Sequence, residues 1–205
     1  NSMNNISLKQ AINHPKWKMG YKNSIDSSTL ANKCLEIIEA HYLFNISFDK
    51  LKILIHPDAL VHSIIEYNNY NSVMNYFYHD MIIPLINFFN FSLKKNIYPK
   101  INKNYNFENI NSLSFSKPNL SQFPIYKIFN SIDKDNPSNL IKFNCANEFA
   151  VDLFVKKKVK YQKIAQIVDK SLSLDFNTNV NNVKSIIEFQ NNYVKLLNTN
   201  MKKFL

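Results

Sequence analysis

The sequence predicts an α+β fold, in which a small sheet packed on helices is followed by a C-terminal helical bundle. Three observations lead to this prediction. Residues 50–78 contain alternating segments rich in β-branched side chains, as strands do. The chain after Pro124 carries apolar residues at helical spacing. Hydrophobic residues make up 45% of the 205 residues, which is enough for a packed core. We expect a first domain over residues 1–111 and a helical domain over 112–205.

Residues 26–44 predict one amphipathic helix. Asp26 or Ser27 supplies a side-chain oxygen of the kind that caps the first amides of a helix. The apolar side is formed by Leu30, Leu35, Ile37, Ile38 and Leu43. The opposite side is polar, so we expect this helix to cover a core with one face.

The segments after this helix predict strands first and helices later. Residues 50–56 alternate, and residues 59–67 and 72–78 flank an NNYN turn, so each segment predicts a strand. Residues 80–91 predict a helix, and the polar stretch 92–111 predicts a connector. The helices of the bundle are predicted over 125–132, 139–158, 161–173 and 180–204.

Composition argues against several classes of function. The net charge is +10, but the lysines are scattered and the chain is rich in Asn, Lys and Ile throughout, so we do not expect a nucleic-acid partner. The only glycine, Gly20, cannot form the glycine-rich loops that bind dinucleotides. No apolar run approaches the roughly 18 residues of a membrane span, so no membrane partner is expected. Cys34 and Cys145 lie far apart and are expected to be small core residues in a reducing compartment.

One face of the first predicted helix carries polar side chains at spacings of three and four, namely Thr29, Asn32, Lys33 and Glu36. Two interpretations are open. The face is solvated and holds a Lys33–Glu36 ion pair, or Ser27, Asn32 and Lys33 bind a phosphate near a helix N-terminus. Glu36 could ligate a divalent metal, but one carboxylate is not a metal site.

Two further groups of residues have open interpretations. The segment HPKWKMG places His14, Trp17 and Met19 in a predicted loop just before the helix. Large apolar side chains on a loop either fold onto a core or close over a ligand. His56 and His62 could act together, although buried structural histidines are commoner.

The stretch from HPKWKMG to IDSSTLANKCLEIIEAHYLF resembles the motif HPxWxMGxKxxxDSATMMNKGLExIEA of the 1-deoxy-D-xylulose 5-phosphate reductoisomerase family. The resemblance continues, in order, through ILIHPDALVHSIIEY, DMIIPL, LSFSKPNLSQFP and NCANEFAVDLF. It implies the second half of a catalytic domain followed by the family's C-terminal helical domain. The family converts 1-deoxy-D-xylulose 5-phosphate to 2-C-methyl-D-erythritol 4-phosphate in the non-mevalonate isoprenoid pathway, with NADPH and a divalent metal, Mg²⁺ or Mn²⁺.

The resemblance also implies roles for individual residues. The phosphate-binding positions of the family are matched by Ser27, Asn32 and Lys33, and one metal-ligand carboxylate by Glu36. The loop that closes over substrate is matched by His14, Trp17 and Met19, and a histidine near the active site by His62. Gly20, assigned to the cofactor side of the site, would give the loop its flexibility.

The chain departs from the family pattern in ways that shape the expected function. The nucleotide-binding domain and the Asp-Ser-Glu metal motif have no match in it, and Cys34, Asp58 and Ala59 replace the residues usual at their positions. We therefore expect a fragment of an NADPH-dependent reductoisomerase that is inactive alone. The alternative is a non-catalytic relative that serves as a dimerisation or phosphosugar-binding module. A sugar-phosphate substrate, a homodimer and a plastid or bacterial cytoplasm are expected by the same resemblance.

Overall fold

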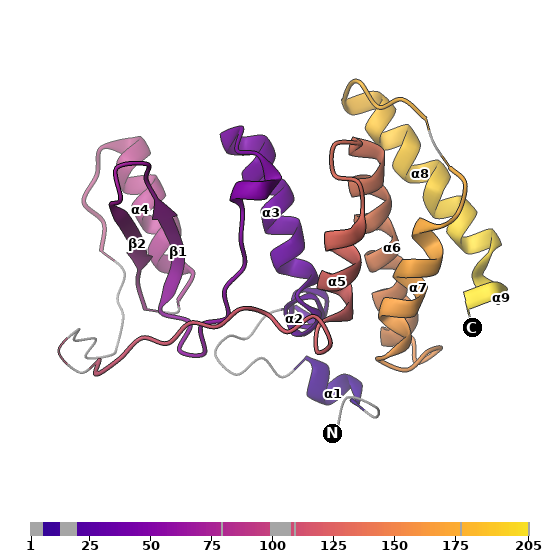
Figure 1. Cartoon of the computed structure of the whole chain (residues 1–205), viewed down its shortest axis with the longest axis horizontal. Coiled ribbons are helices and arrows are strands. Elements are labelled where there is room, and N and C mark those ends of the chain that lie inside the picture. The colour runs from indigo at the N-terminus through magenta and orange to yellow at the C-terminus, as the bar shows by residue number, and fades with distance from the viewer. Residues whose placement is uncertain are drawn as a thin grey trace. The chain divides into compact units, whose positions relative to one another are not determined.

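A computed structural model describes residues 6–12, 20–78, 80–98, 108, 110–176 and 178–204. It consists of helices and a small antiparallel sheet, which confirms the predicted α+β class (Figure 1). The chain forms two compact units. Of the described residues, unit 1 comprises those within 6–12, 20–53 and 118–204, and unit 2 comprises those within 54–117. The domain boundary between residues 111 and 112 stays a prediction.

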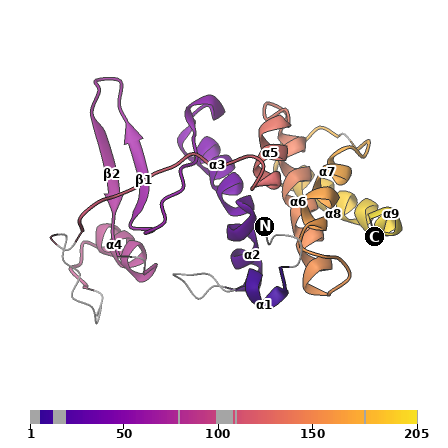
Figure 2. The same ribbon diagram turned by 60° about the horizontal axis from the view of Figure 1, so that its bottom comes forward.

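Unit 1 is built from helices around one core. They are α1 (Leu8–Ala11), α2 (Tyr21–Thr29), α3 (Ala31–Phe44), the 3₁₀ turn η2 (Phe48–Lys50), α5 (Pro124–Ser131), α6 (Pro137–Val155), α7 (Lys163–Leu172), α8 (Val183–Thr199) and α9 (Met201–Phe204). Helix α6 packs against both α7 and α8, and the three lie side by side in both views (Figures 1 and 2). Phe143, Ala146, Ala150 and Leu153 of α6 are all buried, so the predicted helical bundle is confirmed.

Local signals in the sequence explain where the bundle helices begin. Asn136 accepts a hydrogen bond from the Ser138 amide at 3.0 Å, and Pro137 fills the first helical position of α6. Asn182 caps α8 by accepting from the Ser185 amide at 2.9 Å, while the Ser185 hydroxyl accepts from the Asn182 amide. These caps satisfy amides that the helices leave unpaired at their first turns.

The prediction of one helix over 26–44 is wrong, because α2 and α3 meet at a break at Leu30 (Figure 1). Leu30 has φ 63° and ψ 9°, a left-handed conformation that ends α2 and precedes α3. That conformation costs a leucine about 1 kcal/mol or more, since its Cβ crowds the backbone. Burial of the Leu30 side chain, which is 6% exposed, offsets the cost. Asp26 and Ser27, expected as N-caps, lie inside α2 instead.

Unit 2 contains β1 (Val61–Glu66), β2 (Ser72–Tyr76) and α4 (Ile82–Leu93). The strands pair antiparallel, with Ile64 opposite Met74 and Glu66 opposite Ser72, which confirms two of the three predicted strands. The third, over 50–56, is wrong. Its first residue belongs to η2, and it contributes one isolated bridge, between Ile55 and Ser116.

Helix α4 matches its prediction in place but carries no buried side chain. Its exposed apolar residues are Ile82, Leu85, Phe88, Phe89, Phe91 and Leu93. No helix in the described part of the chain is both long enough and apolar enough to cross a membrane.

Candidate functional site

The polar face of α3 begins two residues after the break. Asn32 Nδ2 donates to Glu36 Oε1 at 2.6 Å, and Lys33 Nζ donates to Glu36 Oε2 at 2.7 Å. The side chains of Lys33 and Glu36 are each 46% exposed, so their ion pair contributes at most about 1 kcal/mol to stability. The structure thus brings together three of the predicted site residues, Asn32, Lys33 and Glu36.

The start of α3 also presents backbone amides. In an α-helix the amide of residue i bonds to the carbonyl of residue i−4, so the first amides have no partner in their own helix. The Ala31 amide donates to Thr29 Oγ1 at 3.3 Å, and the Cys34 amide is the first to reach a carbonyl, that of Leu30, at 3.1 Å. The amides of Asn32 and Lys33 lie between these two. Together with the helix dipole and the Lys33 ammonium group, they suit an anion such as phosphate.

Ser27 lies on the other side of the break, in the last turn of α2. Its carbonyl accepts from the Leu30 amide at 3.2 Å, and its side chain is half-buried. Within the described part of the chain, no hydrogen bond joins the Ser27 side chain to Asn32 or Lys33. The sequence predicts Ser27, Asn32 and Lys33 on one helix. The break instead leaves Ser27 on α2 and the other two on α3.

A buried carboxylate behind the break links α2 to α6. Asp26, 1% exposed, accepts from Asn147 Nδ2 at 2.9 Å and from Lys22 Nζ at 2.7 Å. Because a carboxylate only accepts, the contact fixes the orientation of the Asn147 amide. Among the described residues, Asn147 Oδ1 has no hydrogen-bond partner, although Asn147 is 0% exposed. A buried charge held by two donors is expensive to disturb, so this bridge is a firm link between the helices.

The two cysteines lie in the core of unit 1, as predicted. Burial raises the pKa of the Cys34 thiol to about 12, with a smaller opposing effect from Lys134. Burial also raises the pKa of Cys145 to about 11, with a further contribution from Glu148. Both are buried free thiols, and their burial disfavours the thiolate form that attacks electrophiles or binds metals.

The remaining predicted site residues belong to unit 2, precede α2 or lie outside the described residues. His62 lies on β1 in unit 2, where its Nδ1 donates to the Leu60 carbonyl at 2.8 Å and its ring stacks on Phe77 with centroids 3.7 Å apart. Gly20 precedes α2 with φ −57°, and a Cβ added there would meet no atom within 4 Å. His14, Trp17 and Met19 fall on residues 13–19, which lie outside the described residues.

The sequence reasoning missed Asn147 and the bridge that it forms with Asp26. One signal was present: Asn147 lies on the apolar stripe of α6 between Phe143 and Ala150, where only a partnered polar group is stable. The spacing of four between Lys22 and Asp26 was a second signal. The partner of Asn147 lies 121 residues earlier, so neither signal identifies it.

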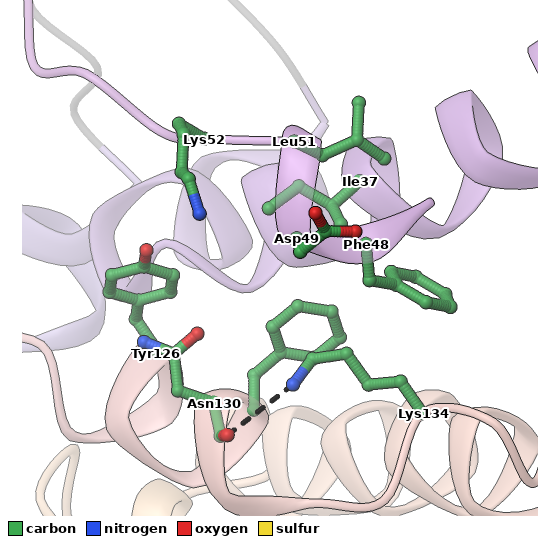
Figure 3. Close-up of a pocket in the computed structure, with 9 residues that line it drawn as sticks. Ile37, Phe48, Asp49, Leu51, Lys52, Tyr126, Asn130 and Lys134 are labelled. Atoms are coloured by element: carbon green, nitrogen blue, oxygen red, sulfur yellow. Dashed lines mark hydrogen bonds between the residues drawn. The ribbon is translucent and has the colours of Figure 1, made fainter. Parts of the chain in front are cut away.

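A hollow of about 210 Å³ in unit 1 lies between α3, η2 and α5 (Figure 3). Lys134 borders it, and its Nζ donates to the Asn130 carbonyl at 3.4 Å and lies 4.9 Å from the Phe129 ring centre. Loss of hydration lowers the pKa of Lys134. Lys52 and Asp49 also line the hollow, so a carboxylate opposes its two cations. Asn32, Lys33 and Glu36 do not line it, and the hollow is therefore separate from the candidate site.

Comparison with known proteins identifies the family. A family model described as the 1-deoxy-D-xylulose 5-phosphate reductoisomerase C-terminal domain matches residues 1–44, and a second, the DXP reductoisomerase C-terminal domain, matches residues 78–195. The chain belongs to the 1-deoxy-D-xylulose 5-phosphate reductoisomerase family. A reductoisomerase from Clostridium acetobutylicum is 36% identical over 197 residues, covering 95% of this chain and 50% of the relative. One from Clostridium novyi is 37% identical over 183 residues, covering 89% and 47%.

Solved reductoisomerase structures agree with the fold. A crystal structure of DOX-P reductoisomerase in complex with NADPH, fosmidomycin and magnesium matches with a TM-score of 0.83 and 31% identity, over 98% of this chain and 50% of that chain. The Zymomonas mobilis enzyme in complex with NADPH matches with a TM-score of 0.77 and 29% identity, over 94% and 49%. The chain spans about half the length of the reductoisomerases that it matches. The first family model covers the whole α2–α3 region.

Proposed function

We propose that the chain is the C-terminal part of an NADPH-dependent reductoisomerase that converts 1-deoxy-D-xylulose 5-phosphate to 2-C-methyl-D-erythritol 4-phosphate. The observation that supports this most is the start of α3. Asn32, Lys33 and Glu36 are brought together there, beside backbone amides suited to a phosphate and inside the matched segment 1–44. Asn32 and Lys33 would hold the phosphate group of the substrate, with Ser27 contributing from the end of α2.

The remaining predicted roles belong to the same proposal. His14, Trp17 and Met19 would close over the substrate, Gly20 would allow that closure, and His62 would lie near the reacting groups. Family membership is the support for these five roles.

A metal site would need ligands besides Glu36, since one carboxylate does not hold a divalent ion. Glu36 is the one predicted ligand, and the described residues contain no group of three His, Cys, Asp or Glu side chains that could hold a metal ion. Both Glu36 oxygens already accept hydrogen bonds, from Asn32 and Lys33. A Mg²⁺ or Mn²⁺ ion would therefore compete with these donors, and it would supply charge stabilisation for the substrate oxygens when bound. Gly20 is the only glycine of the chain, so the NADPH phosphates would bind elsewhere in the protein.

A comparison of two lysines tests the substrate role. Lys33 and Lys156 form ion pairs of the same length, 2.7 Å, with side chains 46% and 59% exposed. In the natural gene product that contains these residues, NADPH consumption with 1-deoxy-D-xylulose 5-phosphate and Mg²⁺ is measured. Lys33→Ala should lower kcat/KM by about 10²-fold through loss of a charged donor, and Lys156→Ala should leave it unchanged. Equal effects of the two variants, or no turnover by the unaltered protein, would contradict the proposal.

The alternative function is a non-catalytic module for phosphosugar binding or dimerisation. The engagement of both Glu36 oxygens favours it, since this face is satisfied without a metal. This alternative predicts that the protein binds the sugar phosphate by calorimetry at the same affinity with and without Mg²⁺, and that NADPH is not consumed. A reductoisomerase should bind substrate more tightly with the metal present.

Two further expectations accompany the proposal. A homodimer is supported by the exposed apolar side chains of α4 and by Ile65, Val73 and Met74 of the strands. Light scattering on the eluting protein would show twice the mass of one chain, and a monomer at micromolar concentration would contradict this. The relatives reported above are bacterial, which favours a bacterial cytoplasm over a plastid.

A further inference from the structure

The break at Leu30 creates the N-terminus on which the candidate phosphate site depends. If α2 continued into α3 as one helix, the amides of Asn32 and Lys33 would bond to the carbonyls of Ser28 and Thr29. They would then be unavailable to any ligand. The left-handed Leu30 stops this pairing, so its backbone strain has a consequence for binding.

Three hydrogen bonds surround the break, and one of them reaches the backbone carbonyl of Asp26. Thr29 Oγ1 donates to the Asp26 carbonyl at 3.2 Å and accepts from the Ala31 amide at 3.3 Å. The Leu30 amide donates to the Ser27 carbonyl at 3.2 Å. The Asp26 side chain in turn is held by Asn147 of α6 at 2.9 Å. Asp26 therefore connects the break to the central helix of unit 1, with its backbone carbonyl on the side of the break and its buried carboxylate on the side of α6.

We propose that the Asp26–Asn147 bridge is a positioning device: it fixes α2 so that Leu30 keeps its left-handed conformation and the first amides of α3 stay free for the substrate phosphate. This inference rests on the proposed function, and it adds two positioning residues that do not touch the substrate. Other links hold α2 as well, such as the 2.9 Å hydrogen bond between Ser28 Oγ and Tyr161 Oη. Asp26 differs from these because its own carbonyl belongs to the hydrogen bonds of the break.

A charge-neutral variant and its exchange partner test the bridge. In Asp26→Asn, the new amide has one acceptor atom facing two donors, Lys22 and Asn147, so one hydrogen bond is lost. In the double variant Asp26→Asn with Asn147→Asp, the amide at 26 accepts from Lys22 and donates to the carboxylate at 147, so both hydrogen bonds return. Loss of a merely structural contact would lower stability alone. Loss of a positioning contact would also change the Leu30 backbone and the affinity for phosphate. Tyr161→Phe serves as the matched control, because it loosens α2 without touching Asp26.

Two NMR readouts on this chain separate the outcomes. The first, without ligand, is the Cα and Cβ shifts of Leu30, which report its left-handed conformation. The second is titration with inorganic phosphate, followed at the amides of Asn32 and Lys33. Asp26→Asn should shift Leu30 toward helical values and weaken phosphate binding about tenfold, comparable to the loss of an outer-shell partner at a metal site. The double variant should restore both, and Tyr161→Phe should change neither.

The bridge inference is overturned if Asp26→Asn lowers the melting temperature but leaves the Leu30 shifts and the phosphate affinity as they were. It is also overturned if Tyr161→Phe produces the same shifts. A different result addresses the proposed function alone. The proposed anion site is refuted if phosphate causes no amide shifts in the unaltered chain, or if the Lys33→Ala variant binds phosphate as tightly as the unaltered chain. In either case the Leu30 shifts still decide whether the bridge holds the break.

Discussion

Substitutions at Leu30 test the break between α2 and α3 directly. The test is whether the glycine or the alanine variant at this position has the higher free energy of unfolding. At a left-handed position glycine is more stable than alanine by about 1 kcal/mol, since it lacks the crowding Cβ. At an ordinary helical position the order is reversed by about the same amount. Leu30→Gly should therefore unfold at higher urea than Leu30→Ala. At Leu35, inside α3 and helical, Leu35→Gly should unfold at lower urea than Leu35→Ala.

The absolute costs follow from burial. The Leu30 side chain is 6% exposed, so truncation to alanine should cost about 3 kcal/mol in free energy of unfolding. Leu30→Gly should then cost about 2 kcal/mol, since relief of strain offsets about 1 kcal/mol of the loss. In a chain of this length 1 kcal/mol corresponds to about 2–4 °C in Tm, so the two Leu30 variants should be distinguishable by thermal melting.

Urea unfolding followed by far-ultraviolet circular dichroism measures all four variants under one condition. Only the difference between glycine and alanine at each position is compared, so errors in the cost of cavity formation cancel. If Leu30→Gly is less stable than Leu30→Ala, with the same sign as at Leu35, then Leu30 is helical. The segment 26–44 would then be the one helix that its sequence pattern predicts, and the amides of α3 would be occupied.

Five further outcomes follow from the contacts described above. Asn147→Ala should lower the free energy of unfolding by about 2–3 kcal/mol, through loss of a buried hydrogen bond to a charged group, while Asn144→Ala on the same helix should change it by less than about 0.5 kcal/mol. Equal losses in urea unfolding would contradict the buried bridge. Cys34 and Cys145, whose pKa values burial raises to about 12 and about 11, should react with a thiol reagent at neutral pH only once urea unfolds the chain. Rapid labelling of the native protein at neutral pH would refute that protection. The same shifts predict a free energy of unfolding that falls as the pH rises above about 9, the ordinary thiol value, because the unfolded thiols ionise first; an unchanged free energy of unfolding above that pH would contradict this dependence. Gly20→Ala should leave Tm unchanged or slightly higher, since φ is −57° and the Cβ has space, so any large loss of turnover would report a need for loop flexibility. Tyr193→Phe should cost about 1–2 kcal/mol in urea unfolding, because the fully buried hydroxyl donates to the Ser171 carbonyl at 2.6 Å, and no loss would mean that this bond is not formed.

The fold class and most helices could be predicted because periodicity and caps are local signals. Helices α5, α6 and α8 begin at Asn-capped or proline-marked positions that the sequence displays directly. The break at Leu30 could not be predicted, since leucine disfavours a left-handed backbone and only burial in the folded unit stabilises it. The strand predicted over 50–56 is wrong for a related reason. Its alternation suits a strand, but its one bridge partner, Ser116, lies in a distant polar segment that carries no strand pattern.

The candidate site also has a part that the sequence predicts and a part that only the fold determines. The cluster of Asn32, Lys33 and Glu36 could be predicted, because residues three and four apart meet on any helix. The separation of Ser27 from that cluster could not be predicted, since it depends on the break. Asn147 also required the structure, because its partner is set by how α6 packs against α2 and not by anything near it in sequence.

The bridge between Ile55 and Ser116 has a consequence for dissecting the protein. The Ile55 amide donates to the Ser116 carbonyl at 2.8 Å, and the Ser116 amide donates to the Ile55 carbonyl at 3.0 Å. The two ends of the segment 56–115 therefore lie one strand spacing apart. Chain ends this close can be joined by a two-residue turn. A shortened gene that links residue 55 to residue 116 should therefore yield the helical unit as an independent folding domain, small enough for routine NMR assignment.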